Sequence, residues 1–331
     1  MDKIAFVTGG TGFLGGYLVK KLIQRGFKVK VLVRDPAKFL IKDSCEIIIG
    51  DIRNPELYVD KISDCNYVFH LAGVVTDWAP KKDYFQINVE GTRKLLEIFK
   101  NKKLERFLYI STIDVLDKFR KDILDESCVY TQSKNYYCYT KSLAEGLVFS
   151  YSHRYNMKVS IIIPAWIYGI GDTTLIPELY YQLKKRGMVY ISSKDVVLPL
   201  VHVDNLANAI IDTALSDKTI NESLLISDGE MTWENLCKII CNKYDFLLPV
   251  IVIPYKVAHY LGLLMEVIYI ILKIKQRPLL TRTAVEMLGV SIKLDASKSN
   301  RLISYKPFIS LINGINDYLV WLDNHKFIRY K

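Results

Sequence analysis

A glycine-rich stretch near the N-terminus restricts what this chain can fold into more than any other part of the sequence. It runs from Thr8 to Gly15 (TGGTGFLG), between an apolar run at 4–7 and a helical pattern at 17–25. A strand, a glycine turn and a helix in this order can hold a dinucleotide, because the glycines let the backbone approach the pyrophosphate and the helix N-terminus offers it N–H groups. The glycine spacing alone is a weak signal, so its meaning depends on the residues that follow.

The second predicted strand, 28–33, ends about 20 residues beyond the glycines, where dinucleotide folds read the adenosine ribose. The residues that follow it are Arg34, Asp35 and Pro36. An arginine at this place can pair with the 2′-phosphate of NADP, whereas an aspartate favours the free 2′-hydroxyl of NAD. Since Arg34 comes first, we expect NADP to be preferred over NAD. The alternative is that Arg34 is a plain surface charge.

Two further strand ends carry candidate cofactor contacts. After the strand 45–49, Asp51 could meet the adenine amine or, with equal reason, cap a helix before Pro55. After the strand 66–71, small residues permit a close approach of the cofactor. We expect His70, at the end of this strand, to be a packed histidine, because its sequence neighbours provide no carboxylate partner.

Hydroxyl and phenol groups suggest the chemistry. The strand 106–110 ends in Ser111 and Thr112, at the rim where doubly wound sheets bind ligands. Tyr137 and Lys141 lie four residues apart in a helical pattern, so their side chains share one face. We expect the ammonium to lower the pKa of the phenol, which can then exchange a proton with a substrate hydroxyl or carbonyl.

Tyr130 and Lys134 have the same spacing and form a rival pair. The residues from Tyr130 to Lys134 are polar throughout, which predicts a loop, whereas a helical pattern continues after Lys141. The pair Tyr137 and Lys141 is therefore preferred.

Two later strands complete the pattern. They are predicted at 159–163 and 199–203, and the second is followed by a helix with Asp204 or Asn205 as its N-cap. His202 is a candidate acid or base, but we expect it to be structural.

Five of these segments match, in order, the motifs of one family, and the chain resembles the extended short-chain dehydrogenase/reductase family (the NAD-dependent epimerase/dehydratase superfamily) over most of its length. The matching motifs are Thr8-Gly9-x-x-Gly12-x-x-Gly15, Gly50-Asp51-Ile52, His70-Leu71-Ala72-Gly73, Ser111-Thr112 and Tyr137-x-x-x-Lys141. The resemblance implies an α/β fold, with a doubly wound parallel Rossmann-type sheet and a smaller, mostly helical C-terminal substrate lobe.

The resemblance also implies roles for individual residues. Thr112 would orient the substrate oxygen, Tyr137 would act as the acid and base, and Lys141 would hold the cofactor ribose. The implied cofactor-binding residues are Gly9, Gly12, Phe13, Leu14, Gly15, Arg34, Asp51, Ile52, Leu71, Ala72, Gly73, Tyr137, Lys141, Pro164 and Ile167. The dinucleotide-binding domain would comprise 1–164 plus about 196–216, and the substrate lobe about 165–195 plus 217–331.

Within this family, the 3β-hydroxysteroid dehydrogenase-like and dihydroflavonol-reductase-like branches are most similar to the chain. The residues Arg34-Asp35-Pro36 resemble those of NADP-using reductases, and the run 277–282 resembles the steroid-dehydrogenase branch. Thr112 stands in place of the commoner serine, while Ile163 and Ile170 replace an arginine and a proline. These departures leave the detailed shape of the nicotinamide pocket open.

An apolar stretch at 246–274 is the second informative region. Helix is expected over 257–274, but Glu266 in its middle and a length of only about 18 residues argue against a membrane span. Three readings stay open: a lid over an apolar substrate, an interfacial helix with peripheral membrane contact through 257–274, and a buried packing helix.

The same stretch guides the choice of substrate. An apolar lobe suits a sterol-like, acyl or polycyclic molecule better than a nucleotide sugar, whose diphosphate needs basic groups. We therefore expect an NAD(P)-dependent oxidoreductase that interconverts a secondary alcohol and a ketone on a hydrophobic small molecule. The alternative is a nucleotide-sugar epimerase or dehydratase with the same tyrosine–lysine chemistry, and a third reading is a cofactor-sensing protein without turnover.

Composition excludes several other classes of function. The formal net charge is +10, but the basic residues are scattered without a stripe of interleaved aromatics, so no nucleic-acid binding is expected. The six cysteines form no Cys-x-x-Cys pair and have no nearby histidine, which predicts a reduced cytoplasmic protein without a metal site. The first strand begins about three residues after Met1, so we expect no signal peptide. A homodimer is left open.

Overall fold

A seven-stranded parallel sheet forms the centre of the larger domain. The computed structural model describes residues 2–39, 41, 44–131 and 135–325. Its strands stand in the order β11-β7-β5-β4-β1-β2-β3, and every neighbouring pair is parallel. The strands are β1 (Ile4–Thr8), β2 (Lys28–Val33), β3 (Glu46–Ile49), β4 (Tyr67–His70), β5 (Arg106–Ile110), β7 (Val159–Pro164) and β11 (Glu222–Ile226). The doubly wound parallel Rossmann-type sheet that the family resemblance implies is therefore confirmed.

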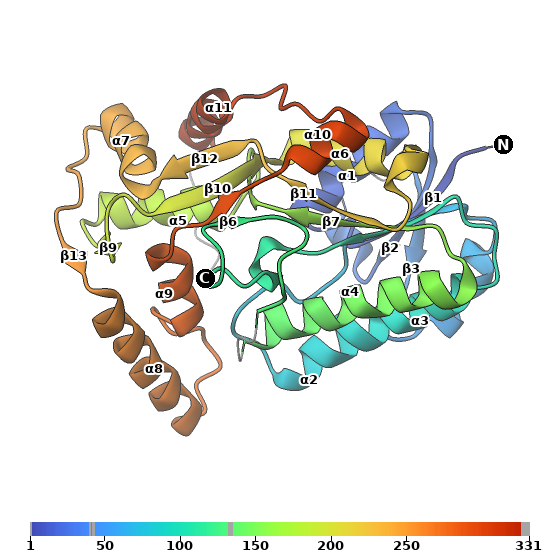
Figure 1. Cartoon of the computed structure of the whole chain (residues 1–331), viewed down its shortest axis with the longest axis horizontal. Helices are drawn as coiled ribbons and strands as arrows, with labels where there is room; N and C mark the ends of the chain where they lie inside the picture. Colours follow the sequence, from blue (N-terminus) through green and yellow to red (C-terminus); the bar gives the residue numbers. More distant parts are fainter. Residues whose placement is uncertain (1, 40, 42–43, 132–134, 326–331) are drawn as a thin grey trace.

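Helices cover both faces of this sheet, as Figure 1 shows. On one face, α1 (Phe13–Gln24) packs against α6 (Val203–Leu215), and their apolar residues share one core cluster. On the other face, α3 (Thr92–Phe99) packs against α4 (Tyr136–Tyr155), and these residues share a second cluster. A π-helical segment (Phe85–Gly91) leads from the short α2 (Lys81–Tyr84) into α3. The sheet is thus buried on both sides, which explains why its strands read as continuous apolar runs.

A smaller lobe is built around a three-stranded sheet in the order β12-β10-β8. The strands are β8 (Trp166–Tyr168), β10 (Val197–His202) and β12 (Gly229–Thr232). Three helices supply the rest of this core: α5 (Leu175–Lys184), α7 (Trp233–Tyr244) and α11 (Leu311–Asn324). Two short parallel pairs join β9 (Tyr190–Ile191) to β13 (Val252–Ile253) and β6 (Ile123–Leu124) to β14 (Lys293–Leu294). The 3-10 turns are η1 (Pro36–Lys38), η3 (Pro55–Leu57), η4 (Val59–Ile62), η6 (Ile113–Val115) and η7 (Asp217–Thr219).

The predicted division of the chain needs correction at two places. Strand β11 comes from the part that was assigned to the substrate lobe, yet it pairs with β7 in the large sheet. Strand β10 was assigned to the dinucleotide-binding domain, yet it pairs with β8 and β12 in the small sheet. The sequence pattern could not reveal either pairing, because both join segments that are far apart along the chain.

A buried arginine joins β5 to β7 and to the segment that precedes β11. Arg106 at the start of β5 is 1% exposed, and its Nη1 donates to Ser160 Oγ at 2.7 Å and to Thr219 Oγ1 at 2.8 Å. Its Nη2 donates to the carbonyl oxygen of Ser216 at 3.0 Å. These bonds satisfy the buried charge only when the segment before β11 is in place.

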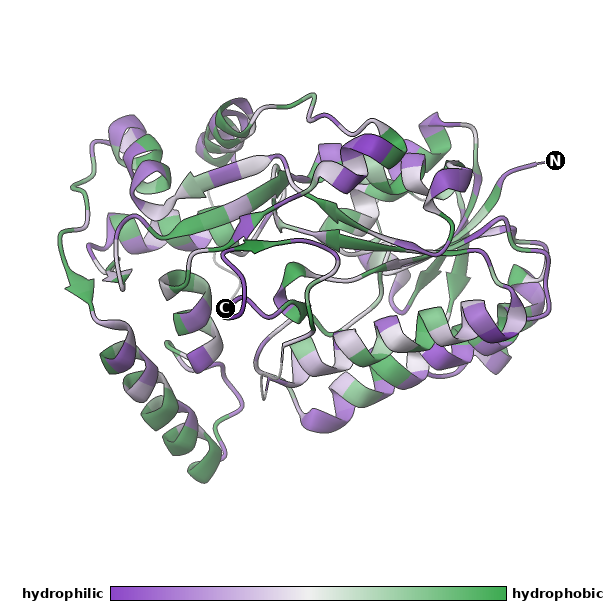
Figure 2. Ribbon diagram, viewed as in Figure 1, coloured by the Kyte–Doolittle hydropathy of each residue, from purple (hydrophilic) through white to green (hydrophobic). Residues whose placement is uncertain are grey.

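The region after β13 forms a helix pair, α8 (Tyr255–Ile271) and α9 (Arg282–Gly289), followed by α10 (Ser297–Ile303). Figure 1 shows α8 projecting from the body of the molecule, and Figure 2 shows that hydrophobic residues dominate it. Only Ala258, Gly262 and Glu266 of α8 are buried, so the reading of this stretch as a buried packing helix is wrong. Among the described residues, no helix combines the length and the apolar character that crossing a membrane requires.

Candidate active site

The glycine turn forms a cradle against the end of β4. Gly9 has a φ of 75°, and a Cβ placed on it would lie 2.8 Å from the amide nitrogen of Ala72. A Cβ on Gly15 would lie 2.1 Å from the carbonyl oxygen of Gly9, so this position too admits only glycine. Helix α1 begins directly after Gly12, without a side-chain cap and without an acidic residue in its first turn. The N-terminal N–H groups of α1 therefore suit the pyrophosphate of a dinucleotide.

Buried side chains hold the loop after β4 beside this cradle. The amide of Ala72 donates to Thr8 Oγ1 at 3.1 Å, and that hydroxyl is hydrogen-bonded to His70 Nδ1 at 2.8 Å. The other ring nitrogen of His70 lies 2.9 Å from Thr92 Oγ1. Burial, together with the charge of Lys141, lowers the pKa of His70 to about 3, so its ring is neutral. His70 is thus a packed histidine, as predicted.

Charged groups follow the ends of β2 and β3. Arg34 is exposed directly after β2, while Asp35 accepts a hydrogen bond from the amide of Ala37 at 3.0 Å and thereby caps η1. Asp51 accepts hydrogen bonds from the backbone and guanidinium of Arg53, both at 2.9 Å, which lower the pKa of Asp51. The predicted helix-capping role of Asp51 is wrong, since Asn54 occupies the N-cap of η3.

Some of the remaining residues predicted to bind the cofactor lie beside the glycine cradle, and the others lie in the hydrophobic core. Leu71 donates its amide to the carbonyl oxygen of Thr8 at 3.3 Å, and Phe13 is partly exposed at the start of α1. The side chains of Ile52 and Leu14 are buried in the two cores of the large domain, so only their backbones can face a ligand. The remaining three residues are placed as follows: Pro164 ends β7, Ile167 lies in β8, and Gly73 lies where a Cβ would be 3.1 Å from Asn88 Oδ1.

The predicted catalytic side chains come from two adjacent elements. Thr112 follows β5, caps η6 and donates its hydroxyl to Asp114 Oδ2 at 3.0 Å. Tyr137 lies in the first turn of α4, whose N-cap is Asn135, and a hydrogen bond with the Thr112 side chain acts on its phenol. Lys141 lies one turn further on, with its Nζ 2.5 Å from the carbonyl oxygen of Ile110 and 4.2 Å from the ring centre of Tyr109.

The expectation that Lys141 lowers the pKa of Tyr137 is wrong for this state of the protein. Burial, reinforced by the charge of Asp114, raises the pKa of Tyr137, and the hydrogen bond with Thr112 opposes this only in part. The Lys141 ammonium is directed to the end of β5, although the spacing of four residues does place it on the same face of α4. The phenol of Tyr137 is therefore protonated at neutral pH.

Lys141 itself has an unusual environment for a cation. It is 5% exposed, and its burial lowers its pKa to about 7, although the charge of Glu145 acts in the opposite direction. Groups on three elements surround it: Tyr109 and the Ile110 carbonyl from β5, Glu145 from α4, and His70 from β4.

Stability should therefore depend on pH through Lys141. Its pKa in the folded protein, about 7, is below the ordinary 10.5, so between these values the unfolded chain binds more protons. The free energy of unfolding of the cofactor-free protein should rise from pH 7 to pH 9, by up to about 1.4 kcal/mol per unit from this residue. Urea titrations of the wild type and Lys141→Met at several pH values measure the effect. Parallel pH dependences of the two proteins would contradict it.

Sequence reasoning missed Glu145, which organises the buried side of α4. It is fully buried in α4, and it accepts hydrogen bonds from the Ser111 hydroxyl and, at 2.8 Å, from the phenol of Tyr130. Ser111 and Thr112 thus have different partners, and Thr112 is the one beside Tyr137. Tyr130 supports the helix instead of competing with Tyr137, while its rival partner Lys134 lies outside the described residues. A glutamate four residues beyond Lys141, on the same helix face, was the available signal.

Asn88 was missed as well. This buried residue of the π-helical segment accepts a hydrogen bond from the amide of Val74 at 2.7 Å and donates to Thr140 Oγ1 at 3.0 Å. It therefore links the loop after β4 to the helix that carries Tyr137 and Lys141. A single asparagine in an amphipathic pattern gives no sign of such a role.

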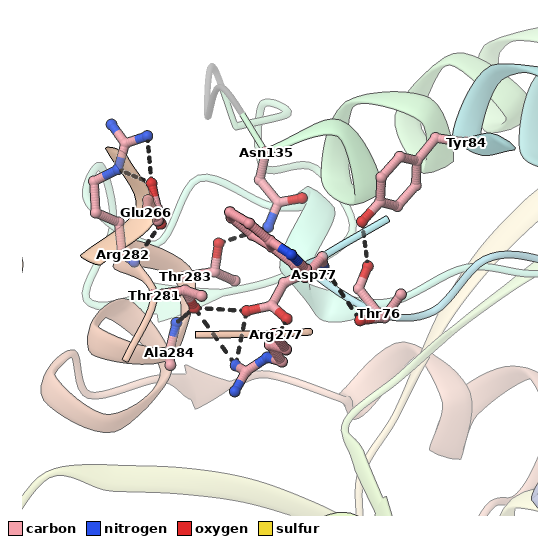
Figure 3. Close-up of polar contacts among 11 residues, drawn as sticks. Thr76, Asp77, Tyr84, Asn135, Glu266, Arg277, Thr281, Arg282, Thr283 and Ala284 are labelled. Atoms are coloured by element: carbon pink, nitrogen blue, oxygen red, sulfur yellow. Dashed lines mark hydrogen bonds and ion pairs between the residues drawn. The ribbon is translucent and has the colours of Figure 1, made fainter. Parts of the chain in front are cut away.

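A polar cluster connects the α8–α9 pair to the loop after β4 and to α4 (Figure 3). Asp77 accepts hydrogen bonds from Arg277 Nε at 2.5 Å and from the Thr281 hydroxyl at 2.6 Å. Asn135, two residues before Tyr137, donates to Thr283 Oγ1 at 2.7 Å. The helix pair is thus held next to the start of α4.

Within the helix pair, a second ion pair joins α8 to α9. Glu266 accepts from the backbone amide of Arg282 at 2.7 Å and lies 2.7 Å from its Nη2 (Figure 3). Gly262, one turn before Glu266, lies close to the backbone at the start of α9. A Cβ on Gly262 would lie 3.1 Å from the amide nitrogen of Arg282.

Residues 5–223 match the model of the NAD dependent epimerase/dehydratase family. Among characterised proteins, the chain is 27% identical to a 2-alkyl-3-oxoalkanoate reductase of Shewanella oneidensis, over 94% of this chain and 84% of that protein. It is also 27% identical to a 3-beta-hydroxysteroid dehydrogenase of Mycolicibacterium neoaurum, over 92% and 87% of the two chains.

Among solved structures, UDP-glucose 4-epimerase from Thermotoga maritima with UDP-glucose superposes with a TM-score of 0.78. The superposition covers 98% of this chain and all of the other, at 18% identity. At this identity the similarity establishes the fold and leaves the substrate open.

Proposed function

Because this chain belongs to the NAD dependent epimerase/dehydratase family, we propose that it interconverts a secondary alcohol and a ketone on a hydrophobic substrate, with NADP or NAD as the hydride carrier. The observation that carries the proposal is the protonated phenol of Tyr137 beside the hydroxyl of Thr112, at the edge of the sheet that holds the glycine cradle. These two groups suit a carbonyl oxygen, which needs a proton when its carbon receives hydride.

Each proposed catalytic residue has one task in this reaction. The nicotinamide, when bound, supplies hydride to the carbonyl carbon or removes it from the alcohol carbon. The Thr112 hydroxyl fixes the substrate oxygen, and Tyr137 delivers a proton to it during reduction or removes one during oxidation. Lys141 holds the ribose hydroxyls, and the Thr112 side chain, which opposes the raised pKa of Tyr137, supports the phenolate that remains after proton donation. The glycine cradle and the N-terminus of α1 bind the pyrophosphate.

The choice of a hydrophobic substrate rests on the charges near the site and on the relatives. The arginines of the helix pair, Arg277 and Arg282, are already paired with Asp77 and Glu266, so they are not available for a diphosphate. Lys184 and Lys185 lie over tyrosine rings at the exposed end of α5. The two relatives described above are named for oxoalkanoates and for a steroid. We infer a sterol-like, acyl or polycyclic substrate.

A panel of substrates tests this proposal. Oxidation of NADPH or NADH should be followed by absorbance with sterol ketones, 3-oxoacyl compounds and polycyclic ketones, and with UDP-sugars in parallel. Net oxidation with a hydrophobic ketone is the expected result. Interconversion of a UDP-sugar without net change of the cofactor would replace the proposal by the alternative, a nucleotide-sugar epimerase, which the fold also accommodates.

We further propose that NADP is preferred over NAD. Asp35 is occupied in capping η1, and Asp51 is paired with Arg53, so neither carboxylate is available as it would be in an NAD-selective site. Arg34 is exposed at the end of β2 and can pair with a 2′-phosphate.

Arg34→Ala should weaken binding of NADPH by about tenfold, the contribution of one charge-assisted bond, and change binding of NADH by less than about twofold. Quenching of protein fluorescence by each cofactor measures the two dissociation constants. Lys38→Ala is the matched control, since Lys38 is an exposed cation of the same turn. Equal losses for both cofactors in Arg34→Ala would show that Arg34 does not read the phosphate.

The proposed division assigns cofactor binding to the seven-stranded sheet with β11, and substrate binding to the small sheet, to α9 and to the side of α8 that packs against α9. We also propose that the stretch 257–274 makes peripheral contact with a membrane, because most of α8 remains exposed although it is apolar.

A further inference from the structure

The outer side of α8 carries a continuous apolar stripe. Val257, Leu261, Leu264, Ile268 and Ile271 follow one another at alternating spacings of four and three residues, which places them along one face of the helix. Each is between 41% and 70% exposed. We call these five residues the outer stripe. The opposite side of α8, with Ala258, Gly262 and Glu266, packs against α9. Figure 2 shows no other element covering the outer side of α8 in this view.

The exposed charges around the outer stripe have one sign. Lys256 precedes it, and Lys273 and Lys275 follow it, all exposed. The stretch 247–281 contains a single acidic residue, Glu266, whose carboxylate is turned inward to Arg282 at 2.7 Å. An apolar stripe with lysines at both ends and its acid withdrawn complements an anionic lipid surface, where headgroups attract the lysines and the acyl boundary accepts the apolar side chains.

The dimensions of α8 suit a helix that lies in the plane of a membrane. Its 17 residues span about 26 Å, which is short of the roughly 20 residues needed to cross the hydrocarbon core. The buried ion pair between Glu266 and Arg282 keeps its inner side attached to α9. Such a helix can enter only the outer about 5–10 Å of one leaflet.

The inner contacts relate this surface to the active site. Thr283 of α9 accepts a hydrogen bond from Asn135, the N-cap of the helix that carries Tyr137. Asp77 binds both Arg277 and Thr281 (Figure 3). The indole of the adjacent Trp78 packs edge-on against Tyr269 of α8. A membrane surface that binds α8 would therefore also lie close to the start of α4.

We propose that the outer stripe and the lysines at its ends dock this protein on an anionic lipid bilayer, with α8 in the plane of the surface and the substrate site next to it. A hydrophobic substrate then reaches Tyr137 from the lipid without dispersing in water. The delivery of substrate rests on the proposed function, whereas the docking rests only on the charge and exposure of α8.

Vesicle sedimentation without substrate or cofactor tests the docking. The wild type should sediment with vesicles of phosphatidylcholine and phosphatidylserine, and binding should fall in high salt and with phosphatidylcholine alone. The variant Leu261→Ser/Leu264→Ser/Ile268→Ser should lose at least about tenfold in partition coefficient, since it removes three apolar side chains that the bilayer would bury. The variant Lys273→Gln/Lys275→Gln should lose about tenfold or more on anionic vesicles only.

Lys184→Gln/Lys185→Gln is the matched control, because it removes two exposed lysines at the far end of α5 and should bind as the wild type does. Circular dichroism confirms that each variant is folded. Equal binding of the wild type and the stripe variant, or equal binding to neutral and anionic vesicles, would overturn the proposal. A second outcome would also overturn the proposal: no protein binds vesicles, and light scattering shows a wild-type dimer that dissociates in the stripe variant. The outer stripe would then contact a second copy of the chain.

The same proteins separate docking from function. With a short, water-soluble ketone, the stripe variant should turn over within about twofold of the wild type, because the outer stripe touches no reacting group. With a ketone carried in anionic vesicles, it should be at least about tenfold slower. Absence of turnover with every ketone in a wild type that does bind vesicles would reject the proposed reaction and leave the docking intact.

Discussion

Replacing Tyr137 with phenylalanine should lower kcat by about two to four orders of magnitude, the usual contribution of a positioned acid or base. The substitution removes only the phenol oxygen, and the ring stays in the first turn of α4 next to Thr112. Because the cofactor is held chiefly by the glycine cradle, its dissociation constant should change by less than about threefold. Steady-state kinetics with a responsive ketone, together with cofactor titration, measure both quantities.

Tyr139→Phe is the matched control for this experiment. Tyr139 lies two residues further along the same helix, and it is 45% exposed with its ring against Phe85. Its loss should leave kcat within about twofold, as expected for a surface substitution. If both variants retained full turnover, Tyr137 would have no part in proton transfer. Loss of cofactor binding in Tyr137→Phe would instead indicate that the ring supports the cofactor site.

Replacing Gly15 with alanine should raise the dissociation constant of the cofactor by at least about a hundredfold. The new Cβ would lie 2.1 Å from the carbonyl oxygen of Gly9 and 2.8 Å from the Cα of Gly10, and both are backbone atoms of the turn itself. The turn must move away from the N-terminus of α1, so the N–H groups that bind the pyrophosphate lose their alignment. Loss of one or two charge-assisted hydrogen bonds accounts for the magnitude.

The neighbouring glycine provides a matched control. A Cβ on Gly16 would meet no atom within 4 Å, so Gly16→Ala should bind the cofactor as the wild type does. It should also stabilise α1 by about 1 kcal/mol, because alanine has the higher helix propensity. Isothermal titration and thermal unfolding of the two variants measure the contrast. Similar cofactor affinities for Gly15→Ala and Gly16→Ala would exclude the cradle as the pyrophosphate site.

The parts of the fold that could be predicted are those specified locally. Strands β2 and β5 were predicted with their observed bounds, because each is a short apolar run that ends at charged or hydroxyl residues. The N-cap of α6 was predicted at Asp204 or Asn205, which is wrong: His202 caps this helix by accepting the amide of Asp204 at 3.2 Å. His202 is nevertheless structural, as expected. Its capping role was not evident because histidine is an uncommon N-cap.

For the candidate site, residue types and spacing predicted which side chains lie together, but they did not predict the pKa values of those side chains. Burial decides the pKa of Tyr137, and it depends on packing between α4, η6 and α2, which no local pattern encodes. The same holds for Glu145, whose partners Ser111 and Tyr130 lie 34 and 15 residues away along the chain. The roles proposed for Thr112, Tyr137 and Lys141 remain predictions until the variants are measured.

The buried Arg106 and the last strand of the large sheet have a consequence for how this protein is made. The glycine turn leaves the ribosome first, yet β7 has an open edge until β11 arrives, and Arg106 lacks Thr219 and Ser216 until the same moment. The sheet can therefore close only after 226 of the 331 residues have been synthesised. Until then, β7, whose residues are all buried in the finished protein, is an edge strand that can pair with other chains. The need for chaperones during translation should therefore fall when β11 covers β7 and Arg106 gains its partners, before the substrate lobe is complete.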